Sequence, residues 1–230
     1  MTWRRAAVIG ASGGIGAAIA EKLEAGGTTV LRYARSGDSA RIDIEDEGSI
    51  AAAADRAGEN GPVDLVFVAT GFLHEEGSGP EKDWRHLDAE NFARNFAINV
   101  TGPALVAKHF LPLLPDDRRG GFAALSARVG SISDNRLGGW YAYRASKAAL
   151  NMMVRSLSIE LARKKPEAFC VGLHPGTVDT RLSEPFQRNV PQGKLFTPDY
   201  SAGMLVDVLA SLEPSDSGKC FAYDGEEIPA

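Results

Sequence analysis

Cysteine is scarce in this sequence, positive charge is not in excess, and no long apolar run is present. Cys170 and Cys220 are far apart without a CxxC partner, so a disulfide framework or zinc cluster is not expected and both should be buried, reduced thiols. Lysine and arginine total 25 against 30 acidic residues, which argues against nucleic acid or an anionic membrane as a partner. No segment approaches the roughly 20 apolar residues of a membrane span. Residues 1–5 lead directly into a strand-like run without a signal-peptide core, so a cytoplasmic protein is expected.

The chain alternates short apolar runs with apolar residues at helical spacing. The runs predict strands over residues 6–10, 28–33, 63–69, 121–126, 168–173 and 220–222. The helical patterns cover residues 15–23, 50–57, 91–114, 142–163 and 201–211. This order predicts an α/β Rossmann fold, a parallel sheet with helices on both faces, as a single domain over residues 1–230.

The loop after the first predicted strand is rich in glycine. Gly10, Gly14 and Gly16 have the spacing GxxxGxG. Glycines at such a junction permit a tight turn and a close approach to a pyrophosphate, which the following helix N-terminus favours. An ordinary glycine-rich turn is the alternative.

The loop after the second predicted strand bears on the choice of nicotinamide cofactor. NAD sites place an acidic residue there, whereas NADP sites carry an arginine. Here Arg32 and Arg35 are present and no carboxylate occurs before Asp38. NADP is therefore favoured over NAD, although arginines that are simply solvent-exposed loop residues would give the same sequence pattern.

Tyr143 and Lys147 are one helical turn apart in the predicted helix over residues 142–163, so they share a face. A phenol has a pKa near 10, and a neighbouring cation favours its ionised form. The pair therefore suits acid–base chemistry, but an isolated YxxxK also occurs by chance on many solvated helices.

Four motifs in order and spacing resemble the short-chain dehydrogenase/reductase family. They are Gly10-xxx-Gly14-Ile15-Gly16, Asn99 in Ile98-Asn99-Val100, Tyr143-xxx-Lys147, and Pro175-Gly176-Thr177-Val178-Asp179-Thr180. The resemblance covers essentially the whole chain. Gly130-Ser131-Ile132 followed by Gly138-Gly139-Trp140-Tyr141-Ala142-Tyr143-Arg144 is most similar to the C-factor and sniffer-like carbonyl reductase branch.

The resemblance implies an NADP site. The residues that would hold the pyrophosphate and the adenosine ribose are Gly10, Ser12, Gly14, Ile15 and Gly16. Arg35 would meet the 2′-phosphate, Asp43 the adenine, and Thr180 the nicotinamide carboxamide. Further residues implied at the cofactor are Ile44, Gly71, Tyr143, Lys147, Pro175, Gly176 and Val178.

The resemblance also implies catalytic roles. Tyr143 would be the general acid in carbonyl reduction and the general base in alcohol oxidation, with Lys147 lowering its pKa and holding the nicotinamide ribose. Asn99 would hold a water that passes protons from Lys147 to solvent. His174 is interpreted as a strand-end residue rather than a catalyst.

Two positions depart from the family pattern. Val68-Ala69-Thr70-Gly71 stands where the family has Asn-Asn-Ala-Gly, so the glycine is retained and the asparagines are not. Ala127 stands where the family has a serine that hydrogen-bonds the substrate carbonyl. Ser131, after the flexible Gly130, is the first candidate to replace that hydroxyl and Ser126 the second; either can equally be a plain loop or strand-end hydroxyl.

Residues 181–197 fall where the family has its substrate-covering loop, and their apolar members suit an apolar carbonyl compound; an irregular surface loop is the alternative. No His, Cys, Asp and Glu cluster has metal-ligand spacing, His74-Glu75-Glu76 included. The predicted function is an NADP-dependent oxidoreductase acting on a carbonyl or secondary alcohol; the alternative is a dinucleotide-binding sensor or signalling protein with little turnover. A homodimer or homotetramer is expected, paired through residues 91–114 and 142–163.

Overall fold

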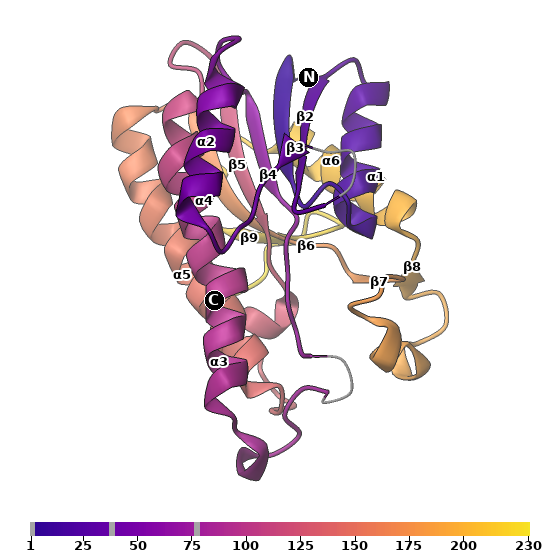
Figure 1. Cartoon of the computed structure of the whole chain (residues 1–230). Coiled ribbons are helices and arrows are strands. Elements are labelled where there is room, and N and C mark those ends of the chain that lie inside the picture. Colours follow the sequence, from indigo (N-terminus) through magenta and orange to yellow (C-terminus); the bar gives the residue numbers. More distant parts are fainter. Residues whose placement is uncertain (1–2, 37–39, 76–78) are drawn as a thin grey trace.

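The computed structural model describes residues 3–36, 40–75 and 79–230, so Asp38 and Glu76 lie outside the described residues. Over these residues a parallel sheet of seven strands has the order β3-β2-β1-β4-β5-β6-β9 (Figure 1). Its strands are β1 (Arg5–Ile9), β2 (Thr29–Ala34), β3 (Ala40–Arg41), β4 (Leu65–Val68), β5 (Gly120–Leu125), β6 (Ala168–His174) and β9 (Cys220–Ala222). A small second sheet pairs β7 (Thr177–Val178) with β8 (Leu195–Phe196).

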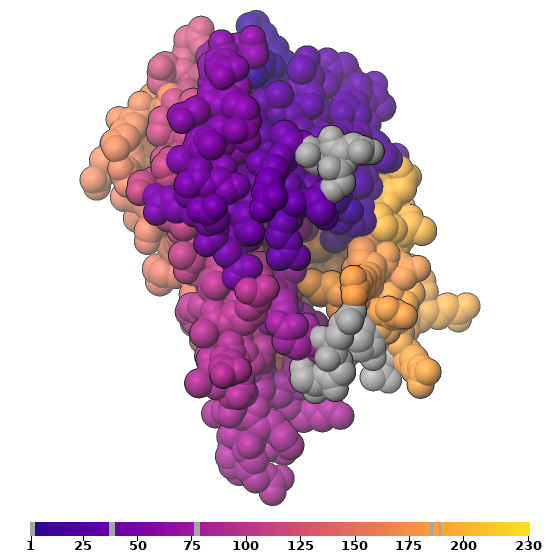
Figure 2. All heavy atoms as spheres, viewed as in Figure 1, coloured from indigo at the N-terminus to yellow at the C-terminus, as the bar shows by residue number. Residues whose placement is uncertain are grey.

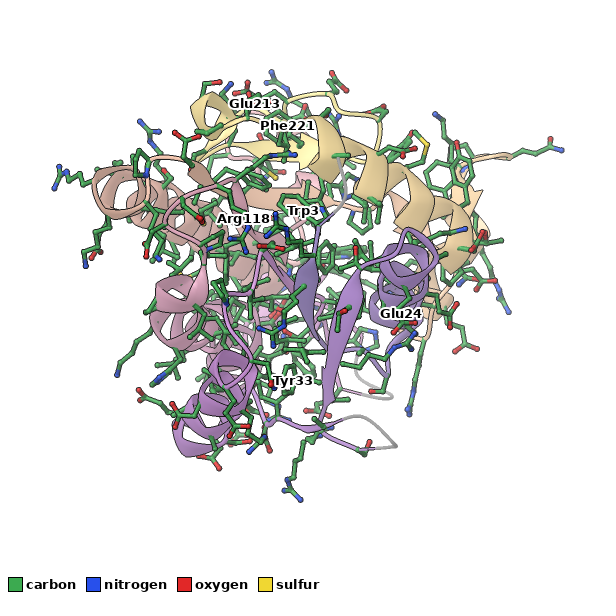
Figure 3. All side chains as sticks on the ribbon, turned by 90° about the horizontal axis from the view of Figure 1, so that it is seen from above. Trp3, Glu24, Tyr33, Arg118, Glu213 and Phe221 are labelled. Carbon is green, nitrogen blue, oxygen red and sulfur yellow. The ribbon has the colours of Figure 1, made fainter. Side chains whose placement is uncertain are left out.

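Helices cover both faces of the large sheet, as Figure 3 shows from above. One apolar core lies between the sheet and α1 (Gly14–Ala25) and α6 (Pro198–Ser211). The other lies between the sheet and α2 (Glu47–Gly58), α4 (Gly102–Phe110) and α5 (Tyr141–Lys164). Central strands such as β4 are buried throughout, which explains their continuous apolar sequence. The predicted Rossmann-type α/β fold is confirmed.

The long helix predicted over residues 91–114 is divided in the structure. α3 (Ala89–Phe96) is followed by a π-helical turn, η2 (Ala97–Thr101), then by α4 and a 3₁₀ turn, η3 (Leu111–Leu113). Pro103 explains the break, because it has no N–H to donate to the carbonyl of Asn99 four residues earlier and its ring crowds that carbonyl. A helical pattern of apolar residues does not reveal this change, which falls on a predicted site residue.

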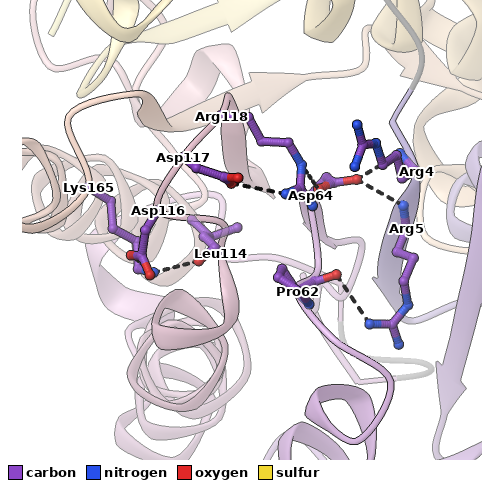
Figure 4. A network of polar contacts seen from close by, with 9 residues as sticks. All are labelled: Arg4, Arg5, Pro62, Asp64, Leu114, Asp116, Asp117, Arg118 and Lys165. Carbon is purple, nitrogen blue, oxygen red and sulfur yellow. Dashed lines mark hydrogen bonds and ion pairs between the residues drawn. The ribbon is translucent and has the colours of Figure 1, made fainter.

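The amino ends of the central strands are joined by a polar network around Asp64 (Figure 4). The buried Asp64 carboxylate accepts hydrogen bonds from the backbone N–H groups of Arg4 and Arg5, at 2.7 and 3.0 Å. The guanidinium of Arg118 donates to the same carboxylate at 2.7 Å. This network fixes the end of the sheet opposite to the glycine-rich loop.

The sheet order places a topological switch point between β1 and β4. Ile9, the last residue of β1, is paired with both Tyr33 and Val68, and the connections run to opposite faces on either side of β1. Ligands bind in α/β sheets outside the carboxyl ends of the strands at such a point. Figure 2 shows the magenta segment with η1 (Trp84–His86) and α3 extending below the rest of the molecule, beside the orange segment near residue 180. Among the described residues, no helix has the length and apolar character needed to span a membrane.

Candidate active site

A cleft of about 820 Å³ lies at the carboxyl ends of β1, β2, β4 and β5. Its lining brings together most of the predicted site residues: Gly10, Ser12, Gly14, Ile15, Gly16, Arg35, Asp43, Ile44, Gly71, Tyr143, Lys147, Pro175 and Thr180. Over the described ranges, Asn99, Ser131, Gly176 and Val178 are not part of this lining.

The turn between β1 and α1 needs glycine at two positions. Gly10 has a φ of 89°, which glycine adopts without strain. A Cβ on Gly16 would lie 2.2 Å from the carbonyl oxygen of Gly10, so glycine is what allows the first turn of α1 to approach β1. α1 also begins without a capping side chain and without an acidic residue in its first turn. Its first N–H groups and its positive dipole end therefore suit a phosphate.

The two arginines after the start of β2 have different positions. Arg32 makes two hydrogen bonds, of 2.9 and 2.6 Å, to the carboxylate of Glu24, which Figure 3 labels on α1. Arg35 lines the cleft. Arg35, rather than Arg32, is therefore placed where it could meet a 2′-phosphate.

Asp43 and Ile44 form a wall of the cleft after β3. The Asp43 carboxylate accepts a hydrogen bond from the N–H of Glu45 at 3.2 Å, and its own N–H donates to Ser49 Oγ at 2.9 Å. Ile44 packs tightly on Gly102, where a Cβ would lie 2.3 Å from Ile44 Cγ1. These contacts hold both residues at the cleft.

Thr70 is a site residue that sequence reasoning treated only as a departure from the family pattern. It lines the cleft beside Gly71, and its buried Oγ1 has no hydrogen-bond partner among the described residues. A buried hydroxyl without a partner is costly unless a ligand or water satisfies it. The glycine turn, the uncapped α1 and this hydroxyl together fit a dinucleotide cofactor.

α5 places Tyr143 and Lys147 on one buried face. Lys147 Nζ donates to the carbonyl oxygen of Leu125 at 2.8 Å and lies 5.6 Å from the centre of the Tyr143 ring. Burial raises the pKa of Tyr143 to about 12 and lowers the pKa of Lys147 to about 8. The phenol therefore keeps its proton at neutral pH, as a general acid must. Burial is the cause of the Tyr143 shift, and it acts in the direction opposite to the lowering of the pKa that the resemblance implies.

Asn99 lies behind the cleft, in the π-helical turn η2. Its Oδ1 accepts from the N–H of Phe72 at 2.9 Å, and its Nδ2 donates to the carbonyl of Phe72 at 2.7 Å. The same Nδ2 lies 3.0 Å from Ser146 Oγ on α5. Because these contacts use both polar atoms of the amide, the Asn99 side chain fixes the loop after β4.

The position aligned with the family serine has only a methyl group next to the phenol. Ala127 packs with Leu73 and Tyr143 in a small apolar cluster. Ser131 is buried away from the cleft lining, and its Oγ accepts from the N–H of Asp134 at 3.1 Å. The structure therefore does not bring Ser131 to Tyr143.

The reason is the 3₁₀ turn η4 (Arg128–Gly130), which packs directly on α5. A Cβ on Gly130 would lie 2.8 Å from Lys147 Cβ. Gly130 thus serves close packing rather than turning Ser131 inward. Ser126 does line the cleft, where its Oγ donates to Asn151 Oδ1 at 2.6 Å.

An aromatic wall stands beside Tyr143. The Trp140 and Phe186 rings are 4.8 Å apart, and Trp140 is 6.4 Å from the Tyr143 ring. Phe186 belongs to η5 (Glu184–Asn189), inside the predicted substrate-covering segment. Its ring centre also lies 5.7 Å from that of His74. The wall is apolar, as the composition of residues 181–197 predicts.

The end of β6 carries the remaining predicted residues. His174 is the last residue of β6, and burial lowers its pKa to about 4, so it is a neutral strand-end residue. Gly176 has a φ of 77°, and a Cβ there would lie 2.6 Å from the Phe196 ring. The Val178 carbonyl accepts from Thr180 Oγ1 at 3.4 Å. Gly176 and Val178 thus shape the base of the segment that carries Phe186.

Sequence reasoning did not select Leu73, which lines the cleft, or Trp140, which packs beside Tyr143. Trp140 has a detectable signal, because a large aromatic residue after two glycines and three positions before Tyr143 must lie near the phenol. Leu73 has none in an isolated sequence, because only the tertiary packing brings the loop after β4 to η4 and α5.

Comparison with known proteins identifies the family to which the chain is similar. The family model described as short chain dehydrogenase matches residues 4–191. The chain is 41% identical over 170 residues to C-signal of Myxococcus xanthus, covering 74% of this chain and 93% of that protein. It is 32% identical over 231 residues to the 1-hydroxy-2-glutathionyl-2-methyl-3-butene dehydrogenase of Rhodococcus sp. (strain AD45), covering 95% and 96%.

Among solved structures, the NADPH-bound carbonyl reductase from chicken fatty liver superimposes with a TM-score of 0.86 at 25% identity, covering all of both chains. The likenesses to C-signal and to a carbonyl reductase agree with the branch that the motifs predict. The chain belongs to the short-chain dehydrogenase/reductase family of oxidoreductases.

Proposed function

We propose that the protein is an NADP-dependent oxidoreductase that transfers a hydride between the nicotinamide and a carbonyl compound or a secondary alcohol. The observation that carries the proposal is the arrangement of one cleft. The protonated phenol of Tyr143 and the amine of Lys147 stand in the same cleft as a glycine turn, the uncapped α1 and Arg35. A cleft that only bound a dinucleotide would not need a buried tyrosine with a lysine one turn away.

The cofactor would lie along the carboxyl ends of the strands. Gly10, Ser12, Gly14, Ile15 and Gly16 would hold the pyrophosphate and adenosine ribose, with Arg35 at the 2′-phosphate. Asp43, Ile44 and Gly71 would contact the adenosine half, and Lys147 with Pro175, Gly176, Val178 and Thr180 the nicotinamide half. Bound NADPH would supply the hydride for reduction.

Tyr143 would donate its proton to the carbonyl oxygen during reduction and take it back during oxidation. Lys147 would stabilise the phenolate that remains, since its ammonium group can reach the same part of the cleft. A water held at Asn99, for example at the main-chain carbonyl to which Pro103 cannot donate, would pass protons from Lys147 to solvent. Leu73, Trp140 and Phe186 would exclude bulk water from the phenol.

The substrate would be an apolar carbonyl compound or alcohol. Leu73, Val129, Trp140 and Phe186 supply the apolar surface around Tyr143. A pocket of this kind binds by shape and apolar contact, with the phenol as the polar group that orients the substrate.

A dinucleotide-binding sensor is the second candidate, because Ala127 places a methyl group where a carbonyl-binding hydroxyl is expected. A single missing donor can reduce catalysis by about a hundred- to a thousandfold. A sensor would bind NADPH without consuming it, whereas the proposed enzyme consumes it with a carbonyl substrate.

The test is NADPH consumption against a panel of aldehydes, ketones and quinones, with Tyr143→Phe as the control. Turnover that depends on Tyr143 supports the proposed enzyme. Tight NADPH binding without turnover on any member of the panel would favour the sensor.

We also propose a homodimer or homotetramer paired through residues 91–114 and 142–163, the segments of α3, α4 and α5. Met152 and Ile159 on α5 are 67% and 46% exposed, and an apolar helix face of this kind suits a second copy. Light scattering at several concentrations tests the assembly. A mass of 24.5 kDa at every concentration would contradict it.

A further inference from the structure

Three buried or half-buried asparagines form a continuous chain of hydrogen bonds on the helix before the cleft. Asn91 and Asn95 lie on α3, and Asn99 follows in η2 one turn later. Asn99 Nδ2 lies 3.2 Å from Asn95 Oδ1, and Asn95 Nδ2 lies 3.1 Å from Asn91 Oδ1. Each amide therefore donates toward the preceding one, and we call these three residues the asparagine ladder.

Glu81 terminates the ladder. Asn91 Nδ2 donates to Glu81 Oε1 at 2.6 Å. The other carboxylate oxygen of Glu81 accepts from the N–H of Ala142 at 3.4 Å, and its backbone carbonyl accepts from the N–H of Trp140 at 2.6 Å. Glu81 is only 5% exposed, so these donors and the amino end of α5 compensate for the burial of a polar side chain.

Among the described residues, no other side chain caps the amino end of α5. Trp140, at its N-cap, makes no side-chain hydrogen bond to the helix, and the first turn has no acidic residue. Within the described ranges, Trp140 is also the one residue other than glycine that has a positive φ, 53°. Such a conformation persists only where the surroundings hold it. The contacts of Glu81 supply that restraint at the residue whose ring borders Tyr143.

The other end of the ladder reaches both walls of the cleft. Asn95 Nδ2 lies 3.4 Å from the carbonyl of Leu73, and Asn99 holds Phe72 through two hydrogen bonds. Asn99 Nδ2 also lies 3.0 Å from Ser146 Oγ, and Ser146 Oγ donates to the carbonyl of Tyr143 at 2.8 Å. One polar chain thus ties the loop after β4 to the first turns of α5.

We propose that Glu81, Asn91 and Asn95 are positioning residues that hold the first turn of α5, and with it the phenol of Tyr143, against the loop that carries Leu73. None of the three lines the cleft among the described residues. Glu81 and Asn95 contact the wall residues Trp140 and Leu73 only through main-chain atoms of those residues. They act through Ala142, Trp140 and Asn99. Their effect on turnover rests on the proposed function, whereas their effect on α5 does not.

Glu81→Gln is the principal variant. It preserves shape but places an amide N–H₂ opposite either Asn91 Nδ2 or the N–H of Ala142, so one of the two hydrogen bonds is lost. Glu90→Gln is the matched control, because Glu90 is an exposed glutamate on α3 outside the ladder. Asn91→Ala, at the partly exposed outer end of the ladder, is a second variant if Glu81→Gln does not fold.

Hydrogen exchange measured by mass spectrometry tests the restraint without using activity. Peptides over residues 139–146 should exchange about tenfold faster in Glu81→Gln than in the wild type. Peptides over residues 150–161 and the Glu90→Gln protein should be unchanged. Unchanged exchange over residues 139–146 in both Glu81→Gln and Asn91→Ala would overturn the proposal.

Kinetics in two backgrounds separates positioning from a general loss of structure. In the wild type, Glu81→Gln should lower kcat roughly ten- to a hundredfold, because small misplacements of reacting groups have effects of this size, and should leave NADPH affinity unchanged. In Tyr143→Phe, the same substitution should leave the residual rate unchanged, since there is no phenol to position. An equal fall in both backgrounds would overturn the positioning role. If the wild type consumes no NADPH, the proposed enzyme fails while the exchange result still decides the role of the ladder.

Discussion

Restoring a hydroxyl at position 127 should accelerate reduction. Ala127 lies in contact with the Tyr143 cluster and is 9% exposed, and its backbone is extended, with φ −153° and ψ 148°. A serine can therefore be accommodated there without backbone strain. Its hydroxyl would be a second donor to the carbonyl oxygen as negative charge develops in the transition state.

The size of the effect follows from two opposing terms. A well-placed donor of this kind is worth about a hundred- to a thousandfold in rate. The new hydroxyl would also stand at the N-cap of η4, where it could instead bond to backbone N–H groups. We therefore expect Ala127→Ser to raise kcat about ten- to a hundredfold with little change in KM, as for an interaction made only in the transition state.

The assay is steady-state NADPH oxidation with an aldehyde, for the wild type, Ala127→Ser and Ala127→Gly. Ala127→Gly alters the same position without adding a donor and should give no acceleration. Ser131→Ala should retain wild-type kcat, because Ser131 Oγ is engaged with the N–H of Asp134. An unchanged rate in a folded Ala127→Ser protein, or loss of turnover in Ser131→Ala, would refute this reasoning.

Three further predictions concern the cofactor, the buried lysine and the sheet. Arg35→Ala should weaken NADPH binding roughly ten- to a hundredfold, as expected for charge-assisted contacts to a phosphate, and should leave NADH binding unchanged. Titration of both cofactors measures this, and equal losses of affinity for NADPH and NADH would contradict the prediction. Burial lowers the pKa of Lys147 to about 8, so folding releases a proton between about pH 8 and pH 10.5. The free energy of unfolding of the wild type should therefore rise by about 3 kcal/mol relative to Lys147→Met across that window. Denaturant unfolding at several pH values measures the difference, and a difference that does not change with pH would contradict the prediction. Asp64→Ala should reduce the free energy of unfolding by about 2–3 kcal/mol, because it removes the acceptor for Arg118 and two backbone N–H groups, while leaving NADPH affinity unchanged; a loss of affinity at normal stability would show that Asp64 acts on the cleft.

The fold was predictable because its signals are local. In strands such as β4, four consecutive apolar residues, all buried in the structure, predict a buried parallel strand from the sequence alone. The same locality explains the glycine turn, since the sequence itself places Gly10 and Gly16 around the first strand-to-helix junction.

The site was predictable where residues share one element. Tyr143 and Lys147 are on one helix, so spacing alone brings them together. The break at Asn99 and the position of Ser131 were not predictable in this way. The break at Asn99 depends on how Pro103 interrupts the regular helix and leaves a π-helical turn. The position of Ser131 depends on Gly130 packing against Lys147, which lies on another element.

Residues that act across the fold leave the weakest signal in the sequence. Glu81 caps a helix that begins 60 residues later in the chain, and it stands in an irregular segment with no motif. Thr70 departs from the family pattern, yet its hydroxyl, which has no hydrogen-bond partner among the described residues, lies at the cleft. Only the tertiary structure shows that both belong to the neighbourhood of the site.

The most direct test of the central claim compares wild type and Tyr143→Phe in NADPH-dependent reduction of an aldehyde, together with NADPH binding. The substitution removes only the phenol oxygen, so the apolar packing around residue 143 is preserved. We expect kcat to fall by about a hundredfold or more while the Kd for NADPH stays the same. Wild-type turnover in folded Tyr143→Phe would contradict the assignment of Tyr143 as the proton donor.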